Sequence, residues 1–247
     1  MRHILSILAV FFLILPLKSA AQNGEWHNFR HLNASSIHSL AATSGDIWCG
    51  TPEGLIRYNK QTGETYTYGK EEGLYAVDDI NFDPPAPFTN IVIDANGLIW
   101  ASWDYGLCSF DGETWTVYNV IRDMMDISER IEYYSCSITS MAVDDSGRIF
   151  VAIETKYNTG TYHGPNINYG AKIVCFENNK WETIVGYLKN KEQIYSYRAL
   201  HVDPNGMLWY EKTGYGINWY DTEEHALLPS WLPEASPDAI AVDTDGT

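Results

Sequence analysis

The stretch Asn90–Asn119, NIVIDANGLIWASWDYGLCSFDGETWTVYN, contains four short apolar segments separated by residues typical of tight turns. The first segment ends at Asp94, and Asp111-Gly112 separates the last two. Asp-Gly at that place favours a hairpin in which both turn positions have positive φ. We therefore expect four consecutive antiparallel strands, at residues 90–93, 98–103, 107–110 and 114–118.

The turn after the first segment recurs along the chain, and an aromatic residue follows it each time except at the C-terminus. The steps from glycine to glycine are 52, 50, 59 and 40 residues, which suits one four-stranded unit per repeat. The turns are Ala42–Gly45, Asp94–Gly97, Asp144–Gly147, Asp203–Gly206 and Asp243–Gly246, and the aromatics are Trp48, Trp100, Phe150 and Trp209.

One such sheet cannot bury both of its faces, so the sheets must stack. The sequence thus predicts an all-β fold, a β-propeller with four full four-stranded blades at about residues 37–69, 90–119, 138–186 and 197–228. Aromatic columns on the third and fourth strands are expected to fill the seams between blades: Tyr58, Phe110, Phe176 and Tyr220 on the third, and Tyr66, Trp115 and Trp181 on the fourth.

Both ends of the repeat array predict partial blades. Gly24–Phe29 matches the fourth-strand pattern of Glu113–Tyr118, which predicts an N-terminal outer strand. Residues 238–247 match the start of a fifth blade. We therefore expect residues 22–247 to form an incomplete ring, a propeller fragment.

Residues 1–21 have the features of a secretory signal peptide. Arg2 and His3 precede an apolar run over 4–17, and Ser19-Ala20-Ala21 offers small residues for cleavage. Removing this segment changes the formal net charge from −16 to −18, because it contains Arg2 and Lys18 and no acidic residue. The sequence predicts a periplasmic or secreted protein that binds no nucleic acid and, after cleavage, inserts into no membrane.

Catalytic and metal-binding patterns are weak in this sequence. Cys49, Cys108, Cys136 and Cys175 form no C-x-x-C pair, and we expect free thiols rather than a disulfide. The Asp-x-x-Gly turns lack the oxygen-rich loop that calcium requires, so an Asp that accepts bonds within its own turn explains them. We expect no metal, no cofactor and no catalytic residue. His201 and Glu211 loosely resemble the pair used by metal-dependent propeller lyases, which leaves that activity as an unfavoured alternative.

The string Trp48-Cys49-Gly50-Thr51-Pro52-Glu53-Gly54-Leu55, followed by Arg57-Tyr58-Asn59, resembles the two-component regulator propeller repeat. Only the first blade has the full string, because Ser102-Trp103 replaces Gly-Thr in the second and Phe150 replaces Trp in the third. The resemblance covers about residues 24–247. It implies a periplasmic sensor propeller of a hybrid histidine kinase, many of which respond to glycans. No kinase motif is present in this chain, and a longer parent protein would have to supply the enzyme.

Three insertions, at Asp78–Thr89, Val120–Cys136 and Glu154–Gly170, are expected on one face of the propeller. Within the second, Ser128–Tyr134 is expected to form a short helical turn. The third is rich in aromatic and amide side chains, which suit a carbohydrate or peptide ligand. The predicted ligand-binding residues are Tyr157, Tyr162, His163, Asn166, Asn168 and Tyr169.

These observations favour an exported ligand-binding propeller. The alternative is a secreted or surface propeller that uses the same face to hold a protein partner or a second copy of itself.

Overall fold

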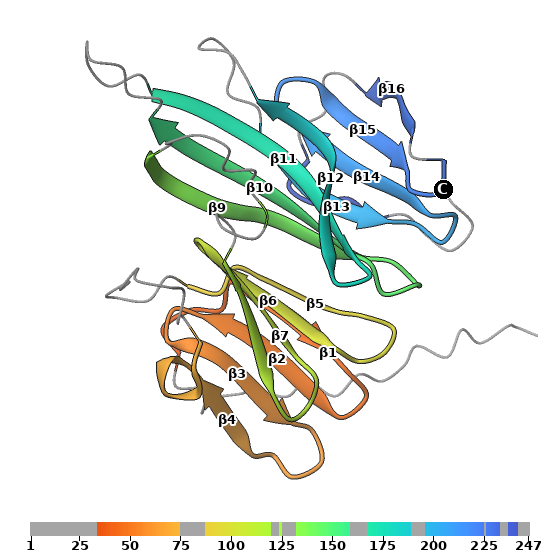
Figure 1. The fold of residues 1–247 in the computed structure, drawn as a ribbon. Helices are drawn as coiled ribbons and strands as arrows, with labels where there is room; N and C mark the ends of the chain where they lie inside the picture. Colours follow the sequence, from red (N-terminus) through yellow and green to blue (C-terminus); the bar gives the residue numbers. More distant parts are fainter. Residues whose placement is uncertain are drawn as a thin grey trace, which may run out of the picture. The chain divides into compact units, whose positions relative to one another are not determined.

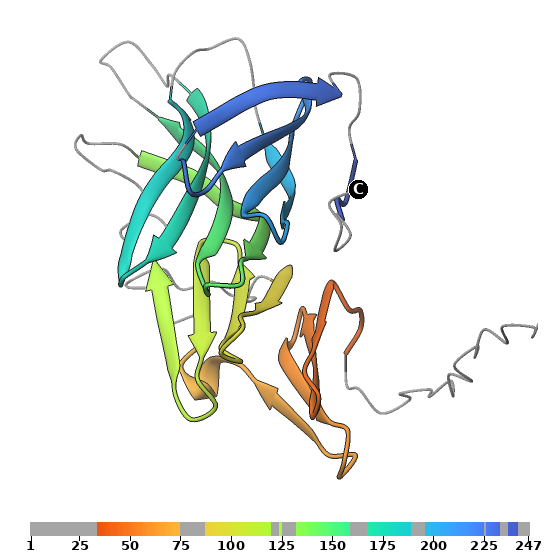
Figure 2. The same cartoon turned by 90° about the vertical axis from the view of Figure 1, so that its right-hand side faces the viewer.

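A computed structural model describes residues 34–74, 87–119, 124, 132–158, 167–188, 196–224, 226–232 and 237–241. These residues belong to one compact unit, Leu32–Thr247. They form four antiparallel four-stranded sheets, each with its strands in sequence order from one edge to the other (Figures 1 and 2). The all-β propeller architecture with four full blades is therefore confirmed.

The strands have the following bounds. The first sheet contains β1 (Ser39–Ala42), β2 (Asp46–Thr51), β3 (Gly54–Asn59) and β4 (Thr65–Tyr68), and the second contains β5 (Asn90–Ile93), β6 (Ile99–Trp103), β7 (Gly106–Phe110) and β8 (Trp115–Asn119). The third contains β9 (Glu132–Val143), β10 (Ile149–Asn158), β11 (Ile167–Glu177) and β12 (Lys180–Leu188), and the fourth contains β13 (Tyr197–Val202), β14 (Met207–Lys212), β15 (Gly216–Asp221) and β16 (Ala226–Leu232).

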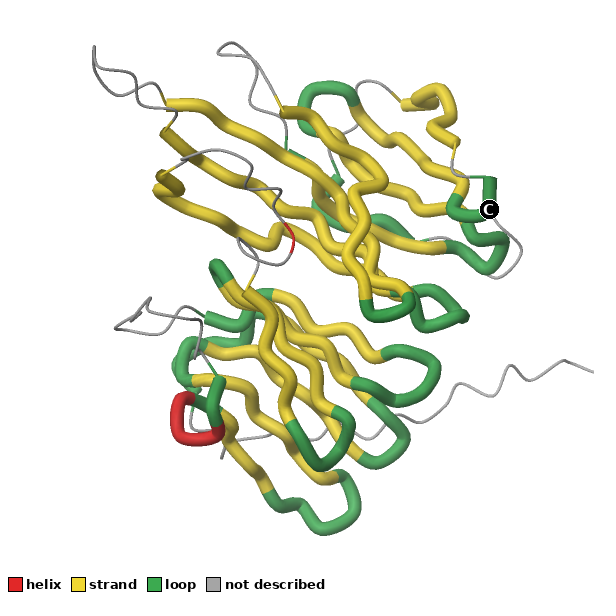
Figure 3. Tube along the Cα trace, viewed as in Figure 1, coloured by secondary structure: helices red, strands yellow, loops and turns green. Residues whose placement is uncertain are grey.

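Strands dominate the described residues, and a short 3-10 helix, η1 (Lys70–Glu72), follows β4 (Figure 3). Within the described part of the chain, no helix is long and apolar enough to span a membrane. The predicted signal peptide and the N-terminal strand Gly24–Phe29 lie outside the described residues. Residues 238–241 of the predicted fifth blade form no strand, and the remainder of that segment is not described.

The third sheet is longer than its predicted range, 138–186. Its first strand begins at Glu132, so the expected helical turn at Ser128–Tyr134 is wrong for residues 132–134: Glu132 and Tyr133 pair with β10, and Tyr134 lies in the strand at a register shift. The third insertion likewise contributes strand: β10 continues to Asn158 and β11 begins at Ile167. Neighbouring strands of this sheet extend together because each added residue gains a partner in the ladder.

The Asp-x-x-Gly turns are closed by their own aspartates, as the sequence predicts. In the three described turns, one carboxylate oxygen of the Asp accepts hydrogen bonds from the backbone N–H groups of the second and fourth residues after it. The donors are Asn96 and Leu98 for Asp94, Ser146 and Arg148 for Asp144, and Asn205 and Met207 for Asp203. The glycine follows with φ of 78–84° in all three turns. In the first repeat the Thr43 hydroxyl accepts the N–H of Asp46, and Gly45 does not adopt positive φ.

The hairpin at Asp111-Gly112 differs from its prediction. Gly112 has a φ of 103°, but Asp111 is not in the left-handed region and instead accepts the N–H groups of Glu113 and Thr114. A two-residue turn with both positions at positive φ occurs at Asn178-Asn179, where φ is 52° and 61°. There Glu177 pairs directly with Lys180.

Successive sheets pack through three hydrophobic seams, called here the first, second and third seams in chain order. The first strands of neighbouring sheets lie side by side, as β1 with β5, β5 with β9 and β9 with β13. Side chains join these strands: Asn90 donates to the carbonyl of Ile138 at 3.1 Å, and the Ser140 hydroxyl accepts the N–H of Leu200 at 3.0 Å.

Side chains on the second strands alternate between two seams, as the period of a strand requires. Trp48, Trp100 and Phe150 project into the seam with the following sheet. The residues at the equivalent preceding position, Ile99, Ile149 and Leu208, project into the seam with the previous sheet. The recurring aromatic of the repeat is therefore a packing residue in these three sheets.

Four aromatic rings fill the outer part of each of the first two seams. Trp48, Tyr68, Phe110 and Trp115 contact one another in the first seam, with centroid separations of 4.5–6.3 Å. Trp100, Tyr118, Phe176 and Trp181 form the equivalent cluster in the second. The prediction that Tyr66 belongs to this column is wrong, because Thr65 pairs with Tyr58 while Tyr66 pairs with Arg57 and is 47% exposed.

Candidate functional site

Three of the six predicted ligand-binding residues, Tyr157, Asn168 and Tyr169, lie on the paired strands β10 and β11. Tyr157 pairs with Asn168 in the ladder, so the backbone places these two directly opposite each other. Tyr169 follows Asn168 on β11. The other three predicted residues, Tyr162, His163 and Asn166, lie outside the described residues. On its other edge β10 pairs with β9, as far as Asn158 with Glu132.

Tyr169 presents an aromatic surface close to a positive charge. Its side chain is 38% exposed, and the ammonium nitrogen of Lys156 lies 5.9 Å from its ring centroid. Lys156 and Tyr169 are cross-strand partners in the β10–β11 ladder, so the pairing register brings them together. An exposed ring can stack on the apolar face of a sugar or on a peptide side chain, and the neighbouring ammonium can donate to an oxygen.

The corresponding turn of the fourth sheet repeats this arrangement, which was not predicted. Tyr215 is 40% exposed, and the ammonium nitrogen of Lys212 lies 4.5 Å from its ring centroid. The Tyr215 N–H donates to the carbonyl of Lys212 at 2.8 Å, which closes the turn between β14 and β15. The signal in the sequence was a Tyr in the second-to-third strand turn, three residues after a Lys.

Tyr105 occupies the equivalent turn of the second sheet in a strained conformation. Its φ is 72°, a region that a bulky side chain rarely adopts. The Tyr105 N–H donates to the carbonyl of Cys136 at 3.2 Å, which holds the turn against β9. Partial burial, followed by the nearby Asp104, raises the pKa of the Tyr105 phenol. Tyrosines thus mark this turn, or the strand leaving it, in the second, third and fourth sheets.

His201 and Glu211 lie on neighbouring strands but are not cross-strand partners. His201 pairs with Trp209 and Glu211 with Arg198, with a register shift between Arg198 and His201. Glu211 is buried, and the Thr213 hydroxyl donates to its carboxylate at 3.3 Å. The described part of the chain contains no group of three or more His, Cys, Asp or Glu side chains placed to hold a metal ion.

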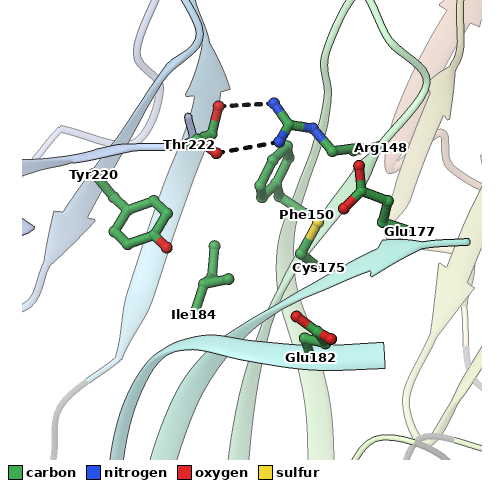
Figure 4. Close-up of a pocket in the computed structure, with 8 residues that line it drawn as sticks. All are labelled: Arg148, Phe150, Cys175, Glu177, Glu182, Ile184, Tyr220 and Thr222. Atoms are coloured by element: carbon green, nitrogen blue, oxygen red, sulfur yellow. Dashed lines mark hydrogen bonds between the residues drawn. The ribbon is translucent and has the colours of Figure 1, made fainter. Parts of the chain in front are cut away.

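A narrow cleft opens in the third seam, at the place that aromatic rings occupy in the first two. Phe150 and Tyr220 occupy aromatic positions of the repeat, but aliphatic residues replace Tyr68 and Tyr118. A register shift places Val185 opposite Ile173, as Tyr68 lies opposite Leu55 and Tyr118 opposite Leu107, and leaves Ile184 as the extra residue beside it. Leu227 pairs with Tyr220, as Trp115 pairs with Phe110 and Trp181 with Phe176. The cleft is lined by Arg148, Phe150, Cys175, Glu177, Glu182, Ile184, Tyr220 and Thr222, and its volume is about 20 Å³ (Figure 4).

Arg148 closes one end of the cleft and joins the third sheet to the fourth. Its Nε donates to the Asp144 carboxylate at 2.5 Å, and its two terminal nitrogens donate to the carbonyl and hydroxyl oxygens of Thr222 at 3.2 and 2.8 Å (Figure 4). The ion pair with Asp144 offsets the guanidinium charge. The burial of Arg148 opposes its charged form, but the contact with Asp144 outweighs this and raises its pKa.

Two acidic side chains, Glu177 and Glu182, also line the cleft. Glu177 and Glu182 are exposed, and neither carboxylate forms an ion pair with a described residue. Both belong to the surroundings of the Cys175 thiol, which lines the same cleft. Burial raises the pKa of Cys175 to about 12, and the upward contributions of Glu177, Asp144 and Glu182 add to this against the lowering effect of Arg148.

The cleft was not predicted, although the sequence contains residues that indicate it. Two of the four aromatic columns change to aliphatic residues at Val185 and Leu227. Because aromatic rings are replaced by smaller side chains in this seam and not in the other two, the sequence predicts a gap here. Protein interiors are otherwise close-packed and contain few voids.

Similar solved structures include extracellular domains of bacterial one- and two-component systems and a bacterial surface component of a secretion system. The extracellular domain of a one-component system of B. thetaiotaomicron, BT4673, matches with a TM-score of 0.58 and 15% identity over 89% of this chain. A structure described as the extracellular domain of the hybrid two-component system BT4673 matches with a TM-score of 0.52 and 13% identity over 78% of this chain. PorZ, a surface component of the type-IX secretion system of Porphyromonas gingivalis, gives a TM-score of 0.47 and 15% identity over 79%.

The chain spans about a quarter of the length of these proteins, covering 26%, 22% and 27% of them respectively. At such identities the likeness shows a shared fold. It agrees with the resemblance of the repeat to the two-component regulator propellers. No family model matches the sequence, and no curated protein matches it.

Proposed function

We propose that this chain is an exported ligand-binding propeller, part of the extracytoplasmic sensor region of a signalling protein, and that it binds a carbohydrate or a peptide at the end of the sheets where β10 meets β11. The observation that carries the proposal is the exposed Tyr169 ring beside Lys156 on an extended, fully paired hairpin. The fold shared with extracellular domains of one- and two-component systems supports the sensor role.

Strand pairing fixes the backbone of Tyr169 and Lys156 before any ligand binds. An exposed aromatic side chain on a flexible loop must lose conformational freedom when it binds, whereas one on a paired strand has already lost it. Tyr215 and Lys212 provide a second aromatic and ammonium pair at the corresponding end of the fourth sheet. A rigid ring beside a donor suits sugar faces and hydroxyls, and it suits peptide side chains and carbonyls equally well.

The test is a screen of residues 22–247 against glycan and peptide arrays, followed by calorimetry on the best binder. We expect Tyr169→Ala, and separately the double change of Tyr162 and His163 to Ala, to weaken binding by about tenfold or more, with little change in thermal stability because surface changes rarely cost much. Tyr66→Ala is the matched control, since Tyr66 is an exposed tyrosine on the outer strand of the first sheet. Equal affinity of all these variants for every binder would contradict the proposal.

A further inference from the structure

We propose that the ligand of the hairpin surface is an acidic glycan, a carbohydrate whose sugar residues carry carboxylate or sulfate groups. This inference rests on the proposed function, because it names the chemical class of the ligand at the same site. It is carried by two aromatic and ammonium pairs from different sheets, Lys156 with Tyr169 and Lys212 with Tyr215.

The pair of the third sheet lies on the face that packs against the fourth sheet. Side chains alternate along β10 and β11, and the ladder between these strands has no register shift. Ala152 and Ala171 on this face are buried in the third seam. Lys156 comes four residues after Ala152, and Tyr169 comes two residues before Ala171, so both side chains project to the same side beyond the buried part of the seam.

The pair of the fourth sheet faces the same seam from the opposite side. Tyr210, which is buried in the third seam, comes two residues before Lys212 on β14, and the cross-strand partner of Lys212 is Tyr197, which is buried in the same seam. The Tyr215 ring lies beside the Lys212 ammonium, 4.5 Å from it. The two pairs therefore flank the third seam where second strands turn into third strands, at the end opposite the Arg148 cleft.

The local charge at this end of the seam is positive. Among the described residues beyond the buried core, the charged side chains on the two facing surfaces are Lys156, Lys212 and Glu154. Glu154 lies on the same face as Lys156 but forms no ion pair with it. Two ammonium groups against one carboxylate favour an anionic group on the ligand.

The charge of the whole chain has the opposite sign and makes this local charge informative. A formal net charge of −16 repels acidic polymers at long range. An acidic ligand therefore gains nothing from non-specific attraction, and its binding has to depend on the lysines that it contacts.

The exposed rings indicate what carries the anionic group. Tyr169 and Tyr215 are 38% and 40% exposed, and each has an ammonium beside it. A uronic acid or sulfated sugar combines an apolar ring face with an anionic substituent in one rigid unit, so one sugar residue can contact the aromatic ring and the ammonium together. An acidic peptide places its carboxylate on a flexible stem that loses rotamer freedom on binding and offers little surface for stacking.

The experiment compares charged and uncharged forms of the same oligosaccharide by isothermal titration calorimetry. Tetragalacturonate is titrated beside its methyl ester, and a chondroitin sulfate tetrasaccharide beside its desulfated methyl ester, so the two series distinguish carboxylate from sulfate. We expect at least one charged form to bind about tenfold more tightly than its uncharged form, the size expected for two exposed ion pairs. Tetraglutamate, an acidic peptide, should bind no more tightly than the uncharged sugars.

Four variants assign the effect to the two lysines. Lys156→Gln and Lys212→Gln should each weaken binding of the charged form by about threefold and leave the uncharged form unchanged. Glu154→Gln removes the neighbouring negative charge and should strengthen binding of the charged form by about twofold. Lys180→Gln is the matched control, because Lys180 is an exposed lysine at the start of β12, and it should bind like the parent protein. Thermal melts check that each variant is folded.

The outcomes separate this inference from the proposed function. If an uncharged sugar binds as tightly as its charged form and Tyr169→Ala weakens both, the proposed site stands and the acidic class is wrong. Tighter binding of tetraglutamate than of the charged sugars, dependent on the lysines, would identify an acidic peptide and overturn the inference. If Tyr169→Ala weakens the binding of none of these compounds, the proposed function and the inference both fail.

Discussion

At the scale of single residues, Trp100 is the clearest case of an aromatic that stabilises the fold rather than binding a ligand. It is 2% exposed, stacks on Tyr118 at 5.5 Å and meets the edge of Phe176 at 5.5 Å. We expect Trp100→Ala to lower the free energy of unfolding by about 3–5 kcal/mol, because a large ring is lost from a close-packed seam. Urea unfolding measures this, with Tyr66→Ala as an exposed control that should change stability little. A stable Trp100→Ala variant that had lost ligand binding would contradict this role.

The sequence predicted the positions of some aromatic side chains correctly and of others incorrectly. Trp48, Trp100 and Phe150 were placed in the seams because a fixed spacing from a closed turn fixes the face of the following strand. Tyr66 was assigned to the wrong column because the β3–β4 connection offers no such reference, and an error of one residue exchanges the two faces of a strand. Tyr215 was not predicted because the repeat comparison covered the strands and the Asp-x-x-Gly turns, and the turn between the second and third strands was not compared.

At the scale of elements, the Asn178-Asn179 turn is the most demanding local geometry in the third sheet. Both residues have positive φ, which costs most non-glycine residues about 1–2 kcal/mol and asparagine less. We expect Asn179→Ala to lower the free energy of unfolding by about 1 kcal/mol and Asn179→Gly to leave it unchanged or raise it slightly. Chemical denaturation of both variants beside Lys180→Ala, an exposed neighbour, would measure the difference. Equal stabilities for the Ala and Gly variants would show that the turn conformation is not limiting.

Strand length is the feature of the elements that the sequence predicted least well. The segments Glu132–Cys136 and Thr155–Asn158 read as insertions because they lie outside the repeat, yet they pair with each other in one extended ladder with a single register shift. Strand pairing depends on a partner that is distant along the chain, so neither segment alone carries the information. The closed turns were predicted well for the opposite reason, since an Asp and a Gly within four residues determine each of them.

At the scale of the whole molecule, the three seams are not equivalent, and three of the four cysteines lie one in each seam. Cys108 lies in the first seam, Cys136 in the second and Cys175 in the third, and all are free and buried. Repeat arrays whose units contact only their neighbours can open locally at the weakest interface. Among the side chains that the structure describes, the third seam has no ring cluster like those of the other two, so we expect it to open at the lowest free-energy cost.

We therefore expect Cys175 to react with a thiol reagent before Cys108 and Cys136 when urea is raised below the main unfolding transition. Burial raises the pKa of Cys136 to about 12 and that of Cys175 to about 12, so the folded thiols stay protonated at pH 8 and reaction reports opening. The labelling is done at pH 8 because the pKa of an unfolded thiol is about 8.5. A thiol whose pKa is raised in the folded state contributes its full stability below that value. The contribution is lost as the pH rises from about 8.5 towards 12, because the unfolded state ionises first. Mass spectrometry of labelled peptides gives the order of reaction, and Ile184→Tyr, which closes the cleft, should delay Cys175 towards the others. Simultaneous labelling of all three thiols in the parent protein would show instead that the seams open as one cooperative unit.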